Sequence, residues 1–169
     1  STSNFVEGDI TVSGGALSSF SGSGTTYTAT FTPSGQGATT IDVASGVFTD
    51  SSSRHNDAAT QFNWTFDSTK PTTTFSPANS ATAVAVASDI TLTFNEAVRL
   101  TNNSALDDSN VDALITLKEN NSSGADIAFN ATINGGKTVI TINPNSNLSS
   151  TQVVYVAIGA TVEDAANNA

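Results

Sequence analysis

The segment DITLTF at residues 89–94 decides the fold. Ile90, Leu92 and Phe94 alternate with polar residues, and this two-residue period is typical of a β-strand with one buried and one solvated face. The same pattern recurs in TYTATFT (26–32), QFNWTF (61–66), DIAFNATI (126–133), TVITIN (138–143) and QVVYVAI (152–158). Turn-forming clusters separate these segments at roughly 8–12-residue intervals, a spacing typical of antiparallel sandwiches. The sequence therefore predicts an all-β protein.

The alternation also predicts which side chains face the core. In each strand the apolar residues share one face because successive side chains of a strand point to opposite sides. The predicted core residues, strand by strand, are Tyr27, Ala29 and Phe31; Phe62, Trp64 and Phe66; Ile90, Leu92 and Phe94; and Ile127, Phe129, Ala131 and Ile133.

Composition limits the classes of partner. The chain of 169 residues has 5 Lys and Arg against 15 Asp and Glu, a net charge of −10. So few cations cannot form the basic surface that nucleic acid or an anionic membrane needs, so we expect neither as a partner. No apolar run approaches 18 residues, so we expect no membrane insertion. The absence of cysteine excludes disulfides and thiol chemistry, and the Ser, Thr and Asn-rich composition favours an extracellular location.

A domain boundary is predicted near residue 70. The segment DSTKPTTTFSP (67–77) is polar and contains Pro71 and Pro77. Pro71 restricts its own backbone and the preceding residue, so this linker should be short and stiff. We therefore expect two domains, residues 1–69 and 70–169.

An internal repeat links the two halves. Residues 9–50 and 113–164 share an order of strand, long loop, strand, tight turn and strand, followed by an acidic end. The repeat aligns the loop FTDSSSRHNDAA (48–59) with VEDAANNA (162–169). The two copies begin and end at different points of the shared pattern. We therefore expect copy one to lack its first strands and copy two to lack its last strand. Open sheet edges at those places would favour a strand-complementing chain or self-association.

The strand and turn texture resembles a known family. DITVSGGALSSFSGSGTTYTATFTP (9–33), IDVASGVFTD (41–50) and FNWTFD (62–67) resemble bacterial Ig-like repeats of large secreted adhesins. DITLTFNEAV (89–98), VITINP (139–144) and YVAIGATVEDAANNA (155–169) resemble the Ig-like modules first described in S-layer proteins. The resemblance implies tandem antiparallel Ig-like β-sandwiches, here each truncated at one end, on the bacterial exterior. Neighbouring repeats of the same polypeptide would be the main partners.

The resemblance and the sequence favour a non-enzymatic extender or stalk of a bacterial surface protein. His55, the single histidine, lies in the polar loop with Ser51–Ser53 and Asp57, but no G-x-S-x-G motif accompanies it. A solvated loop histidine is the favoured interpretation. The alternative function is an accessory or carbohydrate-contacting module of a secreted multidomain hydrolase.

The acidic loops predict a Ca²⁺ site at the junction of the two domains. In an Ig-like sandwich the loops after the second and sixth strands lie at the end where the chain enters. Carboxylate and amide oxygens are the ligands that Ca²⁺ prefers. The expected ligands are Asp67, Glu96, Asp164 and the amide of Asn167 or Asn168. The competing explanation is that Asp and Asn are simply good turn formers.

Copy one should hold a matching half-site in its own acidic loop. The aligned ligands there are Asp50 with Asn56 or Asp57. The glutamate equivalent to Glu96 would lie in the strands that copy one is expected to lack.

Overall fold

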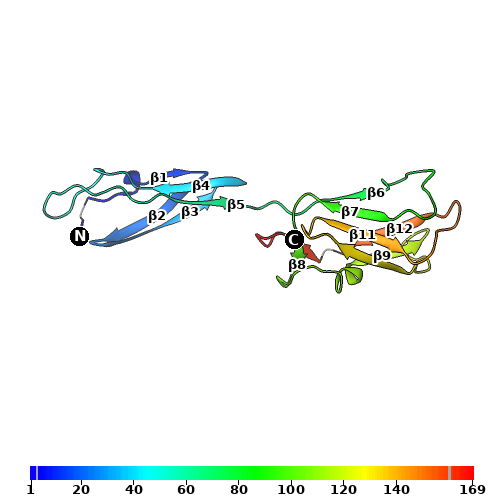
Figure 1. The fold of residues 1–169 in the computed structure, drawn as a ribbon. Helices are drawn as coiled ribbons and strands as arrows, with labels where there is room; N and C mark the ends of the chain where they lie inside the picture. Colours follow the sequence, from blue (N-terminus) through cyan, green and yellow to red (C-terminus); the bar gives the residue numbers. More distant parts are fainter. Residues whose placement is uncertain (3, 160) are drawn as a thin grey trace. The chain divides into compact units, whose positions relative to one another are not determined.

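Alternating apolar residues form antiparallel strands in both halves of the chain (Figure 1). The structure is a computed structural model, and it describes residues 1–2, 4–159 and 161–169. These residues divide into two compact units, unit 1 (Ser1–Thr69) and unit 2 (Lys70–Ala169). The prediction of an all-β, antiparallel protein is confirmed. No helix among the described residues is long and apolar enough to cross a membrane.

The described strands of unit 1 form two small sheets. β1 (Thr11–Ser13), β4 (Gly37–Asp42) and β5 (Phe62–Phe66) pair in the order β1-β4-β5, and a 3-10 turn, η1 (Glu7–Asp9), precedes them. β2 (Gly15–Ser23) and β3 (Thr26–Pro33) form a hairpin. Its tight connection places Gly24 at a φ of 69°, a conformation that glycine adopts without steric cost.

Aromatic rings form most of the interior of unit 1. Phe5 contacts Phe20, Tyr27 and Phe48, with ring centroids 5.6, 5.1 and 4.8 Å apart. In a second group of rings, Phe31 packs edge-on against Trp64 at 5.0 Å. All six rings remain partly exposed. The aromatic core of unit 1 is therefore only partly shielded from solvent.

Two residues that the alternation assigns to the core of unit 1 lie in solvent instead. Phe62 is 63% exposed because it stands at the end of the outer strand β5, opposite Ile41 in the last pair of the ladder. Ala29 is exposed because it faces a bulge, where the partner strand skips from Ser18 to Ser21. Their predicted core positions are wrong. The remaining predicted residues of these strands, Tyr27, Phe31, Trp64 and Phe66, are half-buried.

Unit 2 contains a larger set of strands. Its sheets have the orders β10-β11-β7-β6, β12-β9 and β13-β8. The strands are β6 (Thr73–Ser76), β7 (Ile90–Phe94), β8 (Arg99–Leu100), β9 (Ile115–Glu119), β10 (Phe129–Ile133), β11 (Val139–Pro144), β12 (Val154–Ile158) and β13 (Val162–Glu163), with a 3-10 turn, η2 (Val111–Leu114), before β9.

The core of unit 2 is shielded from solvent. Leu92 on β7 and both Ile140 and Ile142 on β11 are completely buried. Ile90 and Phe94, the other predicted core residues of β7, are also buried, so that prediction is confirmed. β7 lies between β6 and β11, and this central place explains why its alternation predicts burial so well.

Candidate metal centre

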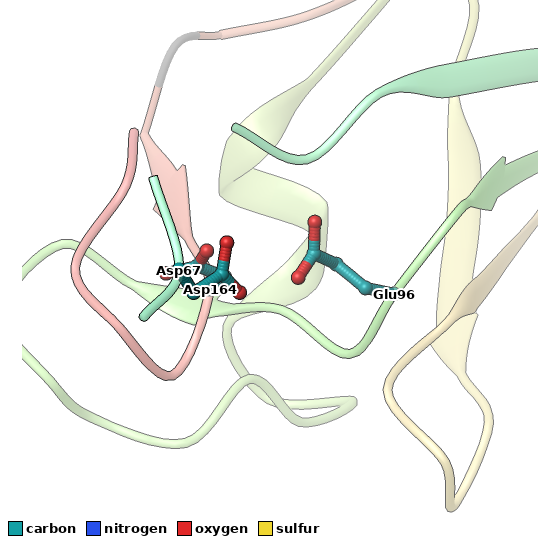
Figure 2. Close-up of side chains that lie close together, drawn as sticks. All are labelled: Asp67, Glu96 and Asp164. Atoms are coloured by element: carbon teal, nitrogen blue, oxygen red, sulfur yellow. The ribbon is translucent and has the colours of Figure 1, made fainter. Parts of the chain in front are cut away.

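Three acidic residues from separate segments meet in one cluster, the candidate metal centre, which consists of Asp67, Glu96 and Asp164. Asp67 directly follows β5, Glu96 follows β7, and Asp164 follows β13. One carboxylate oxygen from each residue lies within 4.8 Å of the other two. Figure 2 shows the three carboxyl groups close together. The sequence placed these three residues in one site, and the structure brings them together.

Asp164 is held rigidly in a loop. Its Oδ1 atom accepts hydrogen bonds from the backbone N–H groups of Ala166 (2.8 Å) and Asn168 (2.9 Å), and its Oδ2 atom accepts one from Asn168 Nδ2 (2.8 Å). Burial raises the pKa of Asp164, but these hydrogen bonds and the charge of Arg99 outweigh it and lower the pKa below its ordinary value. The residue is 1% exposed and is therefore a buried carboxylate that stays ionised at neutral pH.

Glu96 is positioned through its neighbour Asn95. Asn95 Nδ2 donates to Glu96 Oε1 at 3.3 Å, and Asn95 Oδ1 accepts a hydrogen bond from the backbone N–H of Thr72 at 2.6 Å. The backbone N–H of Asn95 also donates to the Thr72 carbonyl oxygen at 3.1 Å. The segment that carries Glu96 is thereby fixed to the segment that enters unit 2. Glu96 itself is half-buried.

Asp67 anchors a turn of its own. Its Oδ1 atom accepts a hydrogen bond from the backbone N–H of Thr69 at 3.0 Å, an arrangement typical of aspartate in a turn. The residue is half-buried. The turn orients the carboxylate while leaving the side chain accessible to solvent on part of its surface.

The structure directs the fourth expected ligand to a different partner. The Oδ1 atom of Asn167 accepts a hydrogen bond from Arg99 Nη2 at 2.9 Å. Asn168, the other amide considered, donates to Asp164. Both amides thus hold the loop around Asp164. The metal-ligand atoms that the structure brings together are the carboxylate oxygens of the cluster.

Arg99 is a residue of this region that the sequence did not reveal. Its Nε atom donates to Glu163 Oε1 at 3.1 Å, and its Nη2 atom donates to the Ala165 carbonyl oxygen at 3.3 Å and to Asn167. Glu163 is only 5% exposed. Because Glu163 is buried, its charge requires a cation such as Arg99, but this burial is evident only in the structure and left no signal in the sequence.

The donor set fits a calcium ion. Ca²⁺ binds oxygen ligands at about 2.3–2.6 Å, so two ligands on opposite sides of one ion are about 4.6–5.2 Å apart. The mutual limit of 4.8 Å lets one oxygen from each carboxylate touch the same ion. Carboxylates this close repel one another, and a divalent cation would offset that repulsion. Backbone carbonyls and water would have to complete the six to eight ligands that Ca²⁺ takes.

Asp50, the aspartate expected to form the half-site of the first copy, is paired with an arginine. Arg54 Nε donates to Asp50 Oδ2 at 2.8 Å, and Arg54 Nη2 lies 2.7 Å from the same oxygen. Asn56 Oδ1 accepts hydrogen bonds from the backbone N–H groups of Val47 and Phe48, so it holds the loop. The candidate metal centre is the one cluster of three potential acidic, histidine or cysteine ligands among the described residues, and it includes neither Asp50 nor Asp57.

Comparison with protein families gives a match over the whole chain. The model of a bacterial Ig-like domain matches residues 67–169, and that of a second bacterial Ig-like domain matches residues 1–66. All three residues of the candidate metal centre fall within the match that begins at residue 67. Searches of curated proteins and of solved structures found no match. The resemblance that the sequence motifs suggested is confirmed, and the chain belongs to the bacterial Ig-like domain family, with two such domains in tandem.

Proposed function

We propose that this chain is a non-enzymatic extender segment of a bacterial extracellular adhesin or surface protein, made stiff by Ca²⁺. The observation that supports the proposal is the convergence of Asp67, Glu96 and Asp164. Tandem Ig-like domains suit a spacer, because each domain adds length and contacts only its neighbours. The proposed location is the cell surface or the extracellular medium, and the charge-poor, acidic composition is compatible with it.

The ion would act on the segment that joins the two domains. Asp67 immediately precedes the linker, whereas Glu96 and Asp164 belong to the second domain. Binding of one ion by all three would tether the linker to the second domain and restrict movement there. An extender requires this restriction if it is to behave as a stiff rod and not as a hinged chain.

Calcium titration with matched variants tests the proposal. Binding to the folded form alone stabilises it by about 2.7 kcal/mol when free Ca²⁺ is a hundredfold above its dissociation constant. Wild type in millimolar Ca²⁺ should therefore melt at a higher temperature than in EDTA, and its small-angle scattering should show a narrower range of shapes. Glu96→Gln keeps the size of the side chain and should lose both effects.

Two controls test whether the response is specific to these carboxylates and to Ca²⁺. Asp126→Asn removes a carboxylate that is 85% exposed and paired with Lys118, so this variant should respond to Ca²⁺ as wild type does. Millimolar Mg²⁺ controls for ionic strength, because Mg²⁺ demands tighter octahedral geometry and gives up its water reluctantly. If Ca²⁺ changes neither the melting temperature nor the scattering of wild type, the acidic residues are ordinary turn residues and the calcium proposal fails.

One observation favours the alternative, a carbohydrate-contacting module. Phe62 is 63% exposed, and its ring centroid lies 5.2 Å from that of the half-buried Trp64. Exposed aromatic rings offer apolar area on which a sugar ring can stack. A glycan array should then show binding that Phe62→Ala abolishes. Absence of any bound glycan, together with a calcium response, would leave the extender as the function.

A further inference from the structure

We propose that Asn95 and Arg99 are positioning residues that assemble the candidate metal centre around Glu96. This inference rests on the calcium proposal above. Asn95 directly precedes Glu96, and Arg99 follows it three residues later at the start of β8. Each of the two ties the segment of Glu96 to a different segment of the second domain.

Asn95 holds the entry side of the centre. It makes three hydrogen bonds, two through its side chain and one through its backbone, with Thr72 and Glu96 as the partners. The bond to Glu96 Oε1 comes from a neutral amide, which orients the carboxylate without neutralising it. Thr72 lies only five residues after Asp67, so Asn95 restrains the chain that carries Asp67 as well.

Arg99 holds the exit side. Its three hydrogen bonds reach Glu163, Ala165 and Asn167, which surround Asp164 in the sequence. The register of β8 with β13 pairs Arg99 with Glu163 directly. The planar guanidinium can satisfy these separate acceptors at once, whereas the ammonium of lysine presents a compact point charge. Arg99 therefore fixes the loop on both sides of Asp164.

The role of Arg99 is geometric and not one of charge alone. Its Nε atom is committed to Glu163, which is buried and would otherwise be an unpaired charge. A cation near the centre would, by its charge, weaken binding of Ca²⁺. Geometry and charge thus predict opposite effects of changing Arg99, and a lysine at this position separates them because it keeps the charge.

Isothermal titration of the full chain with Ca²⁺ tests the inference. Asn95→Ala is expected to weaken binding by roughly 10- to 100-fold, as loss of an outer-shell partner of a metal ligand typically does. Arg99→Lys is expected to weaken binding by a smaller factor, because Arg99 contacts the residues around Asp164 and not a ligand itself. The matched controls change the same residue types elsewhere. Arg54→Lys alters the pair with Asp50, and Asn143→Ala removes the 2.6 Å hydrogen bond to Asp89. Neither control should change the affinity.

The outcomes distinguish this inference from the calcium proposal. If wild type binds no Ca²⁺, the calcium proposal and this inference fall together. If wild type binds and Arg99→Lys binds equally well, the calcium proposal stands and the positioning role of Arg99 is overturned. Urea midpoints in EDTA provide the second readout: a purely structural role would lower the midpoint and leave the affinity of the remaining folded protein unchanged.

Discussion

Asp50 and Asp164 anchor the same loop in the two domains. In each, Oδ1 accepts hydrogen bonds from the backbone N–H groups of the second and fourth residues that follow, at 2.8 and 3.0 Å for Asp50 and at 2.8 and 2.9 Å for Asp164. The backbone N–H of each aspartate donates to the carbonyl oxygen four residues later. The third residue has a φ of 60° or 69°. The loops that the repeat aligned share one backbone design.

The two loops differ in what holds the second carboxylate oxygen. In the first domain Oδ2 receives the charged guanidinium of Arg54, and in the second it receives the neutral amide of Asn168. Asp50 is therefore paired with a cationic side chain of the protein, that of Arg54. Asp164 lies near the carboxylates of Glu96 and Asp67, and the charge of Arg99 also acts on it. We accordingly expect a cation from solution to bind at the second loop and not at the first.

The first prediction concerns the titration of Asp50. The backbone N–H and the side chain of Arg54 lower the pKa of Asp50 from 3.8 to about 2. Because the folded-state pKa is depressed, Asp50 contributes stability above pH of about 4, and this contribution is lost as the pH falls toward about 2. Carboxyl NMR of wild type should show this low pKa.

An arginine variant separates the two causes. Arg54→Gln should raise the pKa of Asp50 only in part, because the backbone N–H of residue 54, the larger cause, remains. Lys118→Gln removes a distant cation and serves as the control. A pKa of Asp50 that stays low in Arg54→Gln would show that the backbone alone sets it.

The sequence predicts strand positions better than it predicts which residues lie in the core. Alternation identified Leu92 correctly because β7 is a central strand, where one face must meet the core along its whole length. It misplaced Phe62 and Ala29, since a strand end and a bulge change exposure without changing the alternation. The register shift between β2 and β3 is a property of two strands, and no single segment encodes it.

The candidate site was predictable to a similar extent. Asp67, Glu96 and Asp164 could be grouped because Ig-like topology brings their loops to one end of a sandwich. Asn167, with Asn168 as the alternative, was expected as a ligand because it lies in the same loop as Asp164 and carries an amide oxygen. In the structure its oxygen accepts a hydrogen bond from Arg99, which the antiparallel register of β8 and β13, two short strands far apart in the sequence, brings close. That register had no signal strong enough to predict.

The second prediction compares the two cores. Leu92→Ala should destabilise the second domain by about 2–5 kcal/mol, because Leu92 is completely buried and the change leaves a cavity. Phe62→Ala should change the stability of the first domain by about 0.5 kcal/mol or less, as expected for a surface position. Urea unfolding followed by far-UV circular dichroism measures both. Fluorescence of Trp64, the single tryptophan, reports on the first domain alone.

The third prediction compares two ion pairs. Glu163→Gln should cost about 1.5–3 kcal/mol, because the Arg99–Glu163 pair at 3.1 Å is largely buried and carries charge-assisted hydrogen bonds. Asp126→Asn should cost less than about 1 kcal/mol even though Lys118 lies only 2.6 Å away, since the aspartate is 85% exposed. Equal urea midpoints for the two variants would contradict this ranking.

The last prediction tests the shared loop directly. The four residues after Asp50 are replaced by those after Asp164, giving Ser51→Ala, Ser52→Ala, Ser53→Asn and Arg54→Asn. The backbone hydrogen bonds to Asp50 do not depend on these side chains, and asparagine tolerates the positive φ at position 53 better than serine does. Loss of the Arg54–Asp50 pair should cost little, because Arg54 is largely exposed and solvent screens the pair. The first domain should therefore keep its fold, measured by Trp64 fluorescence in urea.

Asp50→Ala in the grafted loop removes the acceptor of these hydrogen bonds and should lower the midpoint clearly. A graft that unfolds the first domain while Asp50→Ala alone leaves it intact would show that the side chains, and not the aspartate, define the loop.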